Sequence, residues 1–324
     1  MTGNCPSFAG ATRATSRATF KTGSLPAVDS RGRERRGLGQ PMSGSDDHLA
    51  YYTRQGPFTD PAEYAQLFDG LPAEIPALCR VVQGLVIHFL WAKSYGVEVT
   101  EARRPEMEIR PVSRKLEHLA ARDPRPLDVA REPRARMLGT CRDFSVMLCG
   151  MLRHRGIPAR VRCGFATYFQ ADHYEDHWIV QYWRPGERRW VMVDAQLDAL
   201  QRDQLHVDFD TTDLPTGRFL PAGRAWRMCR DGEADPEKFG ILGMSGRWFV
   251  RGNVVRDLLA LNKLEVSPWD TWRQAARDDD EITDAGLALC DRIASVTHAN
   301  DVDLAEARAL YETIEDVHLP PWLK

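Results

Sequence analysis

The chain has 324 residues, of which 43% are hydrophobic and 27% charged, and its net charge is −3 at neutral pH. This length can bury a substantial core as one large domain or two modest ones, and the composition is typical of globular proteins. The charge balance gives no reason to expect nucleic acid or an anionic membrane as a partner. The longest strongly apolar run, residues 84–92, is far shorter than the roughly 20 residues that span a bilayer, so we expect no transmembrane helix.

Seven cysteines are scattered along the chain at positions 5, 79, 141, 149, 163, 229 and 290, without a Cys-x-x-Cys pair. The count is odd, and a chain of this length does not need disulfide bridges to fold. We therefore expect reduced thiols and a cytoplasmic protein. In such a protein most cysteines pack as small hydrophobes, and one is free to serve as a reactive thiol.

The N-terminal segment differs in composition from the rest. Residues 1–41 contain seven Arg or Lys and only two acidic residues, with few large apolar side chains. Such a segment cannot bury enough apolar surface to offset its ordering entropy. It also lacks the apolar region of a secretory signal. We predict a disordered tail over residues 1–48; an organellar transit peptide and a translation start at Met42 are the alternatives.

Four helices are predicted in the next part of the chain, over Asp60–Phe68, Pro76–Gly96, Val112–Ala121 and Cys141–His154. Asp60 and Pro61 suit the N-cap and the first position of a helix. The second helix has a wide apolar face that two polar residues, Gln83 and His88, interrupt. Gly156 ends the fourth helix.

Three strand-like runs follow, rich in β-branched and aromatic residues, at Ala159–Phe169, His177–Trp183 and Arg189–Asp194. From Pro221 onward the apolar periodicity is helical again, over Phe249–Leu261, Trp269–Ala276, Ile282–Val296 and Leu304–Ile314. The predicted fold class is α+β, an antiparallel sheet packed on a helix that carries Cys141, with additional N- and C-terminal helices.

Cys141 is the candidate nucleophile. It begins the predicted helix, near unsatisfied backbone N–H groups and the positive end of the helix dipole. This environment lowers a thiol pKa, and the thiolate is the form that attacks a carbonyl carbon. Cys149 and Cys163 lie within apolar runs and are interpreted as structural.

His177 and Asp194 are the candidate base and its orienting carboxylate. If the last two predicted strands form a hairpin centred between Pro185 and Gly186, His177 lies directly opposite Asp194. A carboxylate in that position accepts a hydrogen bond from one imidazole nitrogen and leaves the other nitrogen free to act as a base. With Cys141, the set of nucleophile, base and orienter is complete.

Several motifs in fixed order resemble the core of the transglutaminase-like superfamily, a branch of the papain-like enzymes. They cover residues 135–198 and comprise Gly139-x-Cys141-x-x-Phe144, Leu152-Arg153-x-x-Gly156-Ile157-Pro158-Ala159-Arg160, a strand with Gly164, His177-Trp178 and Trp190-Val191-Met192-Val193-Asp194. The resemblance implies a papain-like fold in which Cys141 is the nucleophile, His177 the general base and acid, and Asp194 the residue that orients His177.

Two departures from the family pattern affect the expected substrate pocket. The family often has His-Ala-Trp where this chain has His177-Trp178, and Asp-Pro-Thr where it has Asp194-Ala195-Gln196. We expect Trp178, Gln196 and Tyr168, which ends its strand shortly before the loop to His177, to contact the substrate. The resemblance predicts three segments: the tail over 1–48, a transglutaminase-like catalytic domain with N-terminal helices over 49–220, and a helical region packed on it over 221–324.

The predicted activity is cysteine-dependent acyl transfer through a thioester on Cys141, with a peptide, a protein or a small amide or acyl compound as substrate and no cofactor. Hydrolysis, deamidation and transamidation remain open. So does a second class, a binding module that keeps the fold without turnover. His173 and His177 invite a metal interpretation, but in an extended segment they lie too far apart to share one ion, so no metal site is predicted.

Overall fold

The computed structural model describes residues 44–275 and 282–323. The α-helices are α1 (Gly44–Thr53), α2 (Ile75–Leu85), α3 (Val112–Arg122), α4 (Cys141–His154), α5 (Ala199–Gln204), α6 (Ala222–Arg230), α7 (Arg247–Leu261), α8 (Asp284–Thr297) and α9 (Leu304–Thr313). The strands are β1 (Val86–His88), β2 (Met137–Gly139), β3 (Ala159–Ala166), β4 (Tyr174–Arg184), β5 (Arg189–Val193), β6 (Phe219–Pro221), β7 (Phe239–Ile241) and β8 (Met244–Ser245). Short 3-10 helices are Ala62–Phe68, Phe89–Tyr95, Glu101–Glu108, Pro133–Ala135, Pro236–Lys238, Arg273–Ala275, Glu315–Val317 and Pro321–Leu323.

The main sheet is organised around β4. Its strand order is β6-β3-β4-β7-β8, and β5 also pairs with β4. Neighbouring described strands run antiparallel, except that β7 runs parallel to β4. A separate pair, β1 and β2, is parallel and leads directly into α4. Helices packed around this sheet give the predicted α+β class. β4 is its central strand and pairs with β3, β5 and β7.

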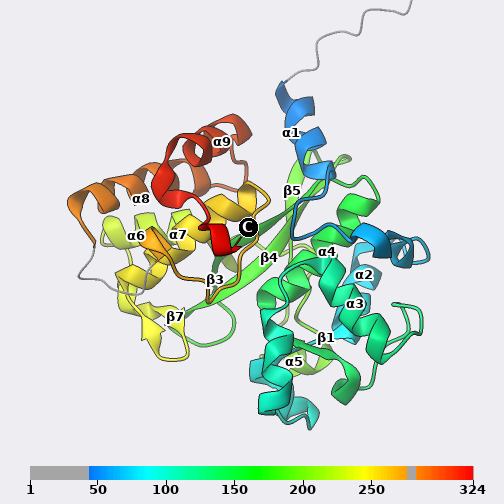
Figure 1. The fold of residues 1–324 in the computed structure, drawn as a ribbon. Coiled ribbons are helices and arrows are strands. Elements are labelled where there is room, and N and C mark those ends of the chain that lie inside the picture. Colours follow the sequence, from blue (N-terminus) through cyan, green and yellow to red (C-terminus); the bar gives the residue numbers. More distant parts are fainter. Residues whose placement is uncertain (1–43, 276–281, 324) are drawn as a thin grey trace, which may run out of the picture. The chain divides into compact units, whose positions relative to one another are not determined.

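The sheet lies between two groups of helices (Figure 1). One apolar cluster joins α2, α3 and α4 to the strands β3, β4 and β5. A second cluster joins α6, α7, α8 and α9, and it includes Phe165 of β3 and Phe239 of β7. The N-terminal end of α4, with Cys141 and Phe144, is therefore part of the buried cluster on one face of the sheet.

The predicted helix over 76–96 is wrong in its second half. α2 ends at Leu85, where the backbone of Val86 turns to φ −118° and ψ 145°. The next three residues form β1, whose extended backbone pairs with β2. Two β-branched residues, Val86 and Ile87, favour this conformation, and pairing with β2 supplies backbone hydrogen bonds that a helix would otherwise provide. A 3-10 helix then runs to Tyr95, and Gly96 follows in the left-handed region at φ 68°.

The predicted hairpin exists, but its register differs by two residues. Arg184 pairs with Arg189 and Val180 with Val193, because the loop between β4 and β5 has four residues rather than two. Arg188 in this loop takes a left-handed conformation at φ 51°, which its sequence does not suggest. An even shift keeps every side chain on its original face of the sheet.

The other predicted segments differ in smaller ways. β3 ends at Ala166 rather than residue 169, and of the predicted helix over 269–276 the described part contains only the 3-10 turn Arg273–Ala275. The region 221–324 also supplies β7 and β8 to the main sheet. α1 includes residues 44–48 of the predicted tail, and residues 1–43 lie outside the described residues. Of the helices described, none has the length and apolar character needed to cross a bilayer.

Gly164 of β3 is required by the close approach of β6. A Cβ at this position would lie 2.1 Å from the carbonyl oxygen of Leu220 and 2.8 Å from Cζ of Phe219. Gly164 also pairs with His177 of β4, so the same position holds the candidate base in place.

Gly164→Ala is therefore expected to destabilise the fold by about 1–3 kcal/mol, the usual cost of overpacking a well-packed interior. The measurement is the free energy of unfolding in urea. Gly186→Ala is the matched control, because no atom lies within 4 Å of a Cβ there. Equal stability of the two variants would contradict the packing argument.

Candidate functional site

α4 begins at Cys141, and buried charges fix this start. The Asp143 carboxylate accepts hydrogen bonds from the backbone N–H of Thr140 at 2.7 Å and from its hydroxyl at 3.2 Å. The same carboxylate pairs with Lys115 at 2.7 Å and with Arg142 at 3.2 Å, and all three charged side chains are buried. Burial lowers the pKa of Lys115 to about 8. The cap and its cations hold the first turn of the helix, and therefore the position of Cys141.

The thiol meets β4 at an interruption in the sheet. On one side of β4, β7 pairs with Tyr174 and Glu175 and β5 pairs from Val180 onward. In the described part of the sheet, no strand pairs with the backbone between these two ladders on that side. This opening is where the N-terminal end of α4 reaches the strand.

Hydrogen-bond directions show which backbone group faces the opening. Cys163 pairs with Trp178, and the Cys163 N–H donates to Asp257 Oδ1 at 3.0 Å, away from β4. The two residues therefore form a non-hydrogen-bonded pair, and the Trp178 N–H also points away from β3. It donates a hydrogen bond to the sulfur of Cys141. The thiol thus lies against the residue that follows His177.

His177 and Asp194 are in direct contact. The imidazole Nε2 lies 2.9 Å from Asp194 Oδ2, and both side chains are at most 2% exposed. With the observed register, Asp194 would face Ile179, so His177 is its diagonal neighbour on the same face, within reach of these side chains. The predicted contact is present although the predicted direct pairing is wrong. At Asp194 the chain leaves β5, and its N–H donates to the carbonyl oxygen of Thr211 at 2.8 Å.

The hydrogen bonds at Asp194 define the tautomer of His177. Burial raises the pKa of Asp194, but the His177 imidazole and the donated hydrogen bonds outweigh burial, and the pKa lies below its usual value. Tyr168 donates its hydroxyl to Oδ2 at 2.6 Å, and the N–H of Gln196 donates to Oδ1 at 2.8 Å. An ionised carboxylate only accepts, so Nε2 of His177 carries the proton. In the neutral imidazole, Nδ1 is then the free base.

The position of Cys141 at the start of a helix predicted a lowered thiol pKa, but the pKa is raised. Cys141 is 4% exposed, and burial raises the pKa of its thiol well above the usual value. The Asp176 carboxylate raises the thiol pKa further, while the hydrogen bond from Trp178 lowers it. Desolvation outweighs the helix dipole because the sulfur lies within the apolar cluster around α4. The resting thiol is therefore neutral.

Asp176 is a buried acid beside the thiol that the sequence analysis did not identify. It is 4% exposed, and its Oδ1 accepts a hydrogen bond from Asn253 of α7 at 2.7 Å. Burial raises the pKa of Asp176 to about 6, against the hydrogen bond from Asn253 and the charge of Arg256. The sequence gave no signal for it, because Asp176 directly precedes the predicted strand over 177–183 and nothing in the sequence shows that α7 covers it.

The residues expected to contact substrate lie around Asp194 and in the core. Tyr168 is nearly buried and bonds Asp194, while Trp178 is 1% exposed within the apolar cluster around α4. The amide of Gln196 donates to Gln201 Oε1 at 3.1 Å. Within the described residues, the indole nitrogen of Trp178 and Oε1 of Gln196 are buried without a hydrogen-bond partner. Their expected contact with substrate stays a prediction.

The remaining candidates have defined surroundings. Gln83 donates to the carbonyl oxygens of Ala195 at 3.1 Å and Leu197 at 3.3 Å, so it holds the loop that follows Asp194. His173 precedes β4, and its Nε2 lies 3.2 Å from the carbonyl oxygen of Gly240. The residues from Tyr174 to His177 belong to β4 and are extended. The capping carboxylate Asp143 was also missed, although a Thr followed by an acid three residues later is a known cap pattern.

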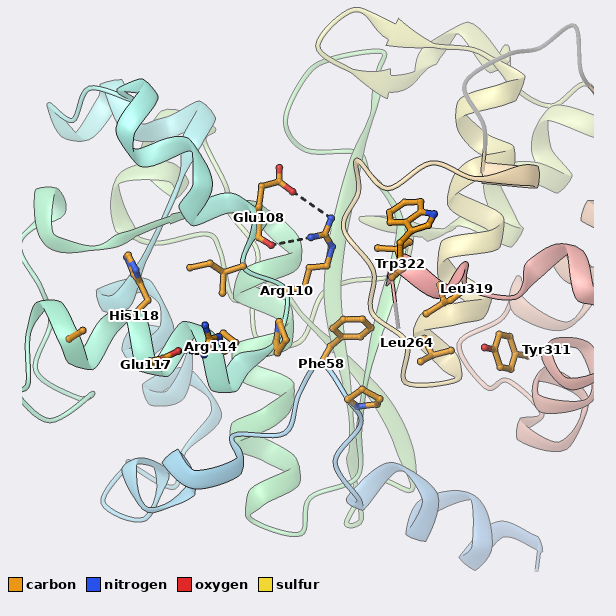
Figure 2. A pocket seen from close by; sticks show the side chains of 15 residues that line it. Phe58, Glu108, Arg110, Arg114, Glu117, His118, Leu264, Tyr311, Leu319 and Trp322 are labelled. Carbon is orange, nitrogen blue, oxygen red and sulfur yellow. Dashed lines mark hydrogen bonds and ion pairs between the residues drawn. The ribbon is translucent and has the colours of Figure 1, made fainter.

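A cavity of about 1000 Å³ lies apart from these residues, and none of Cys141, His177 and Asp194 lines it. Figure 2 shows its walls, formed by the α3 region with Arg110 and Arg114 and by the C-terminal segments with Tyr311 and Trp322.

Arg142 connects this cavity to the start of α4. Its guanidinium donates to the carbonyl oxygen of Arg110 at 2.8 Å and lies 5.5 Å from the ring centre of Phe58, and both residues line the cavity. This cavity therefore adjoins the residue after Cys141 without including the thiol.

Residues 99–195 match a family model, that of the transglutaminase-like superfamily. This segment is similar to the transglutaminase-like core. The matched segment includes Cys141, His177 and Asp194, and it ends one residue before Gln196. No curated protein and no solved structure gives a significant match. The match begins earlier than the motifs noted in the sequence, and α2 and β1 lie outside it.

Asp176→Asn is expected to lower the pKa of the Cys141 thiol by about one unit, because it removes the nearby carboxylate that disfavours the thiolate. The measurement is the rate of alkylation by iodoacetamide against pH, with the adduct mapped to Cys141 by mass spectrometry. Glu175→Gln, one residue away, removes the same charge and serves as control.

The effect has a defined pH window. Asp176 has a pKa of about 6, so it is ionised above that pH and neutral below it. The variant should react faster than the unmodified protein above pH 7, and the two rates should converge below pH 6. A constant ratio of rates across this range would contradict the assignment.

Proposed function

We propose that the protein is a cysteine-dependent acyl-transfer enzyme that forms a thioester on Cys141. The observation that carries this proposal is the arrangement along β4. A hydrogen bond from the Trp178 N–H lowers the pKa of the Cys141 thiol, and the preceding residue, His177, lies 2.9 Å from Asp194. A nucleophile, a base and an orienting carboxylate are the groups that acyl transfer through a thiol requires.

In the proposed mechanism His177 takes the thiol proton at Nδ1 as the sulfur of Cys141 attacks a carbonyl carbon. Asp194 stabilises the resulting imidazolium through the hydrogen bond at Nε2. The proton then passes from His177 to the departing amine or alcohol, leaving a thioester. Water or an amine attacks the thioester with His177 again as base, which regenerates the thiol. The acceptor decides between hydrolysis and transamidation.

The raised thiol pKa supports a mechanism in which the thiol proton moves to His177 while the sulfur attacks the carbonyl carbon, rather than before. A resting thiolate would have to remain charged in an apolar cluster, which costs free energy unless the charge is paired. A neutral thiol avoids this cost until a carbonyl substrate is present. A buried, neutral thiol is also consistent with the alternative, a binding module without turnover. The experiment below distinguishes the two.

The test is acylation by p-nitrophenyl acetate, an activated ester that needs no knowledge of the natural substrate. The unmodified protein should release up to one p-nitrophenolate per chain in a burst and carry an acetyl group on Cys141. Cys141→Ala should lose the burst and slow the reaction by several orders of magnitude. Cys149→Ala, a buried cysteine on the same helix, should keep both.

An unchanged burst in Cys141→Ala would contradict the proposal. So would an acetyl group found only on another cysteine. A protein that is correctly folded but unreactive toward the ester, together with an unreactive Cys141 toward iodoacetamide, would favour the binding module.

A further inference from the structure

His88 lies at the end of β1 and faces the start of α4. β1 and β2 pair in parallel with His88 opposite Gly139, two residues before Cys141. Alternation along β1 puts His88 on the same face as Val86, which belongs with Cys141 to the apolar cluster around α4. Ile87, on the other face, packs in a separate cluster. Gly139 has no side chain, and a Cβ there would lie 2.9 Å from both the Asp143 carboxylate and the Val86 side chain, so β2 packs closely against β1 and the first turn of α4.

The orientation and tautomer of His88 are fixed. Its Nδ1 accepts a hydrogen bond from the N–H of Leu90 at 3.3 Å, as the N-cap of the following 3-10 helix. Its ring stacks on Phe89 with centres 5.2 Å apart and an interplanar angle of 22°. An imidazole that accepts at Nδ1 carries its proton at Nε2. Burial and the neighbouring His177 imidazole lower the pKa of His88 to about 3, so it stays neutral at working pH.

We infer that His88 donates its Nε2–H to the carbonyl oxygen of the substrate as the sulfur of Cys141 adds to the carbon. This inference rests on the proposed acyl-transfer function and assigns a donor to the oxyanion. The sulfur–carbon bond forms, and the electron pair of the C=O π bond moves to oxygen. That oxygen accepts hydrogen bonds from His88 and from the N–H of Cys141, which has no acceptor within its helix. His88 keeps its proton throughout, and His177 carries the proton transfers.

A neutral imidazole suits this role. It donates a hydrogen bond without gaining or losing a proton, and in a water-poor site such a donor stabilises developing negative charge strongly. The alternative is that His88 serves the fold alone, by capping the 3-10 helix through Nδ1. The two roles use different nitrogens of the ring, so two substitutions separate them.

His88→Asn and His88→Gln form the matched pair. Asn keeps a short oxygen acceptor that can cap the 3-10 helix, but it has no donor at the position of Nε2. Gln places an amide N–H near the position of Nε2 and gives up the short cap. A donor role predicts that Gln is the better substitute, and a capping role predicts that Asn is.

The experiment compares two reactions of Cys141 in the full chain. Acylation by p-nitrophenyl acetate passes through an oxyanion, whereas alkylation by iodoacetamide does not. His88→Asn should slow acylation about 100-fold, the loss typical for one oxyanion donor. Its alkylation rate should stay within about threefold, since the thiol and its base are unchanged. His88→Gln should recover at least tenfold of the lost acylation rate.

Three results would overturn the inference while leaving the proposed function intact. Acylation could be unchanged in His88→Asn, acylation and alkylation could fall in parallel, or Asn could outperform Gln. A fourth result would overturn both: the unmodified protein is not acylated on Cys141. Measurements on the unmodified protein thus test the proposed function, and comparison with the variants tests the role of His88.

Discussion

The hydrogen bond from the Trp178 N–H to the sulfur of Cys141 is the contact on which the site depends. It exists because β4 has no strand partner on one side over the few residues between its ladders with β7 and β5. A continuous ladder would use this N–H and exclude the helix end. The interruption leaves the backbone of β4 open to the N-terminal end of α4, and the thiol lies next to Trp178, the residue that follows His177.

Burial then determines how the groups can react. The thiol, the imidazole and the Asp194 carboxylate are each at most 4% exposed. The carboxylate has enough donors around it, including the Tyr168 hydroxyl, to remain charged at rest. The thiol stays neutral, and the buried Asp176 reinforces that state. In the proposed mechanism, charge separation between sulfur and imidazole therefore accompanies attack on a substrate.

The sequence predicted the parts of this site that depend on local pattern. Helix α4 was predicted with its observed bounds because its periodicity and its glycine stop agree. β1 was missed because its pairing partner lies far along the chain, and three residues carry no clear strand signal. The hairpin register was wrong because Arg188 extends the loop in a conformation that is uncommon for its residue type. The contact between His177 and Asp194 survived because the shift was even.

The features that local sequence pattern could not predict depend on tertiary contacts. The direction of the thiol pKa depends on which helices cover the strand, and the neighbourhood of Asp176 depends on α7, which lies far along the chain. The orientation of His88 depends on β1 being a strand, and a helix would have turned its side chain elsewhere. These are the residues on which the structure adds most to the sequence.

The most direct test of the account is the alkylation rate of Cys141 at pH 7 with and without the base. Because burial disfavours the thiolate, reaction with iodoacetamide at this pH needs an imidazole to accept the proton. The account predicts that His177→Gln, which keeps a polar side chain but no base, lowers the rate by about 100-fold or more. An alkylation rate equal to that of the unmodified protein would show that His177 does not act on the thiol, and it would contradict the account.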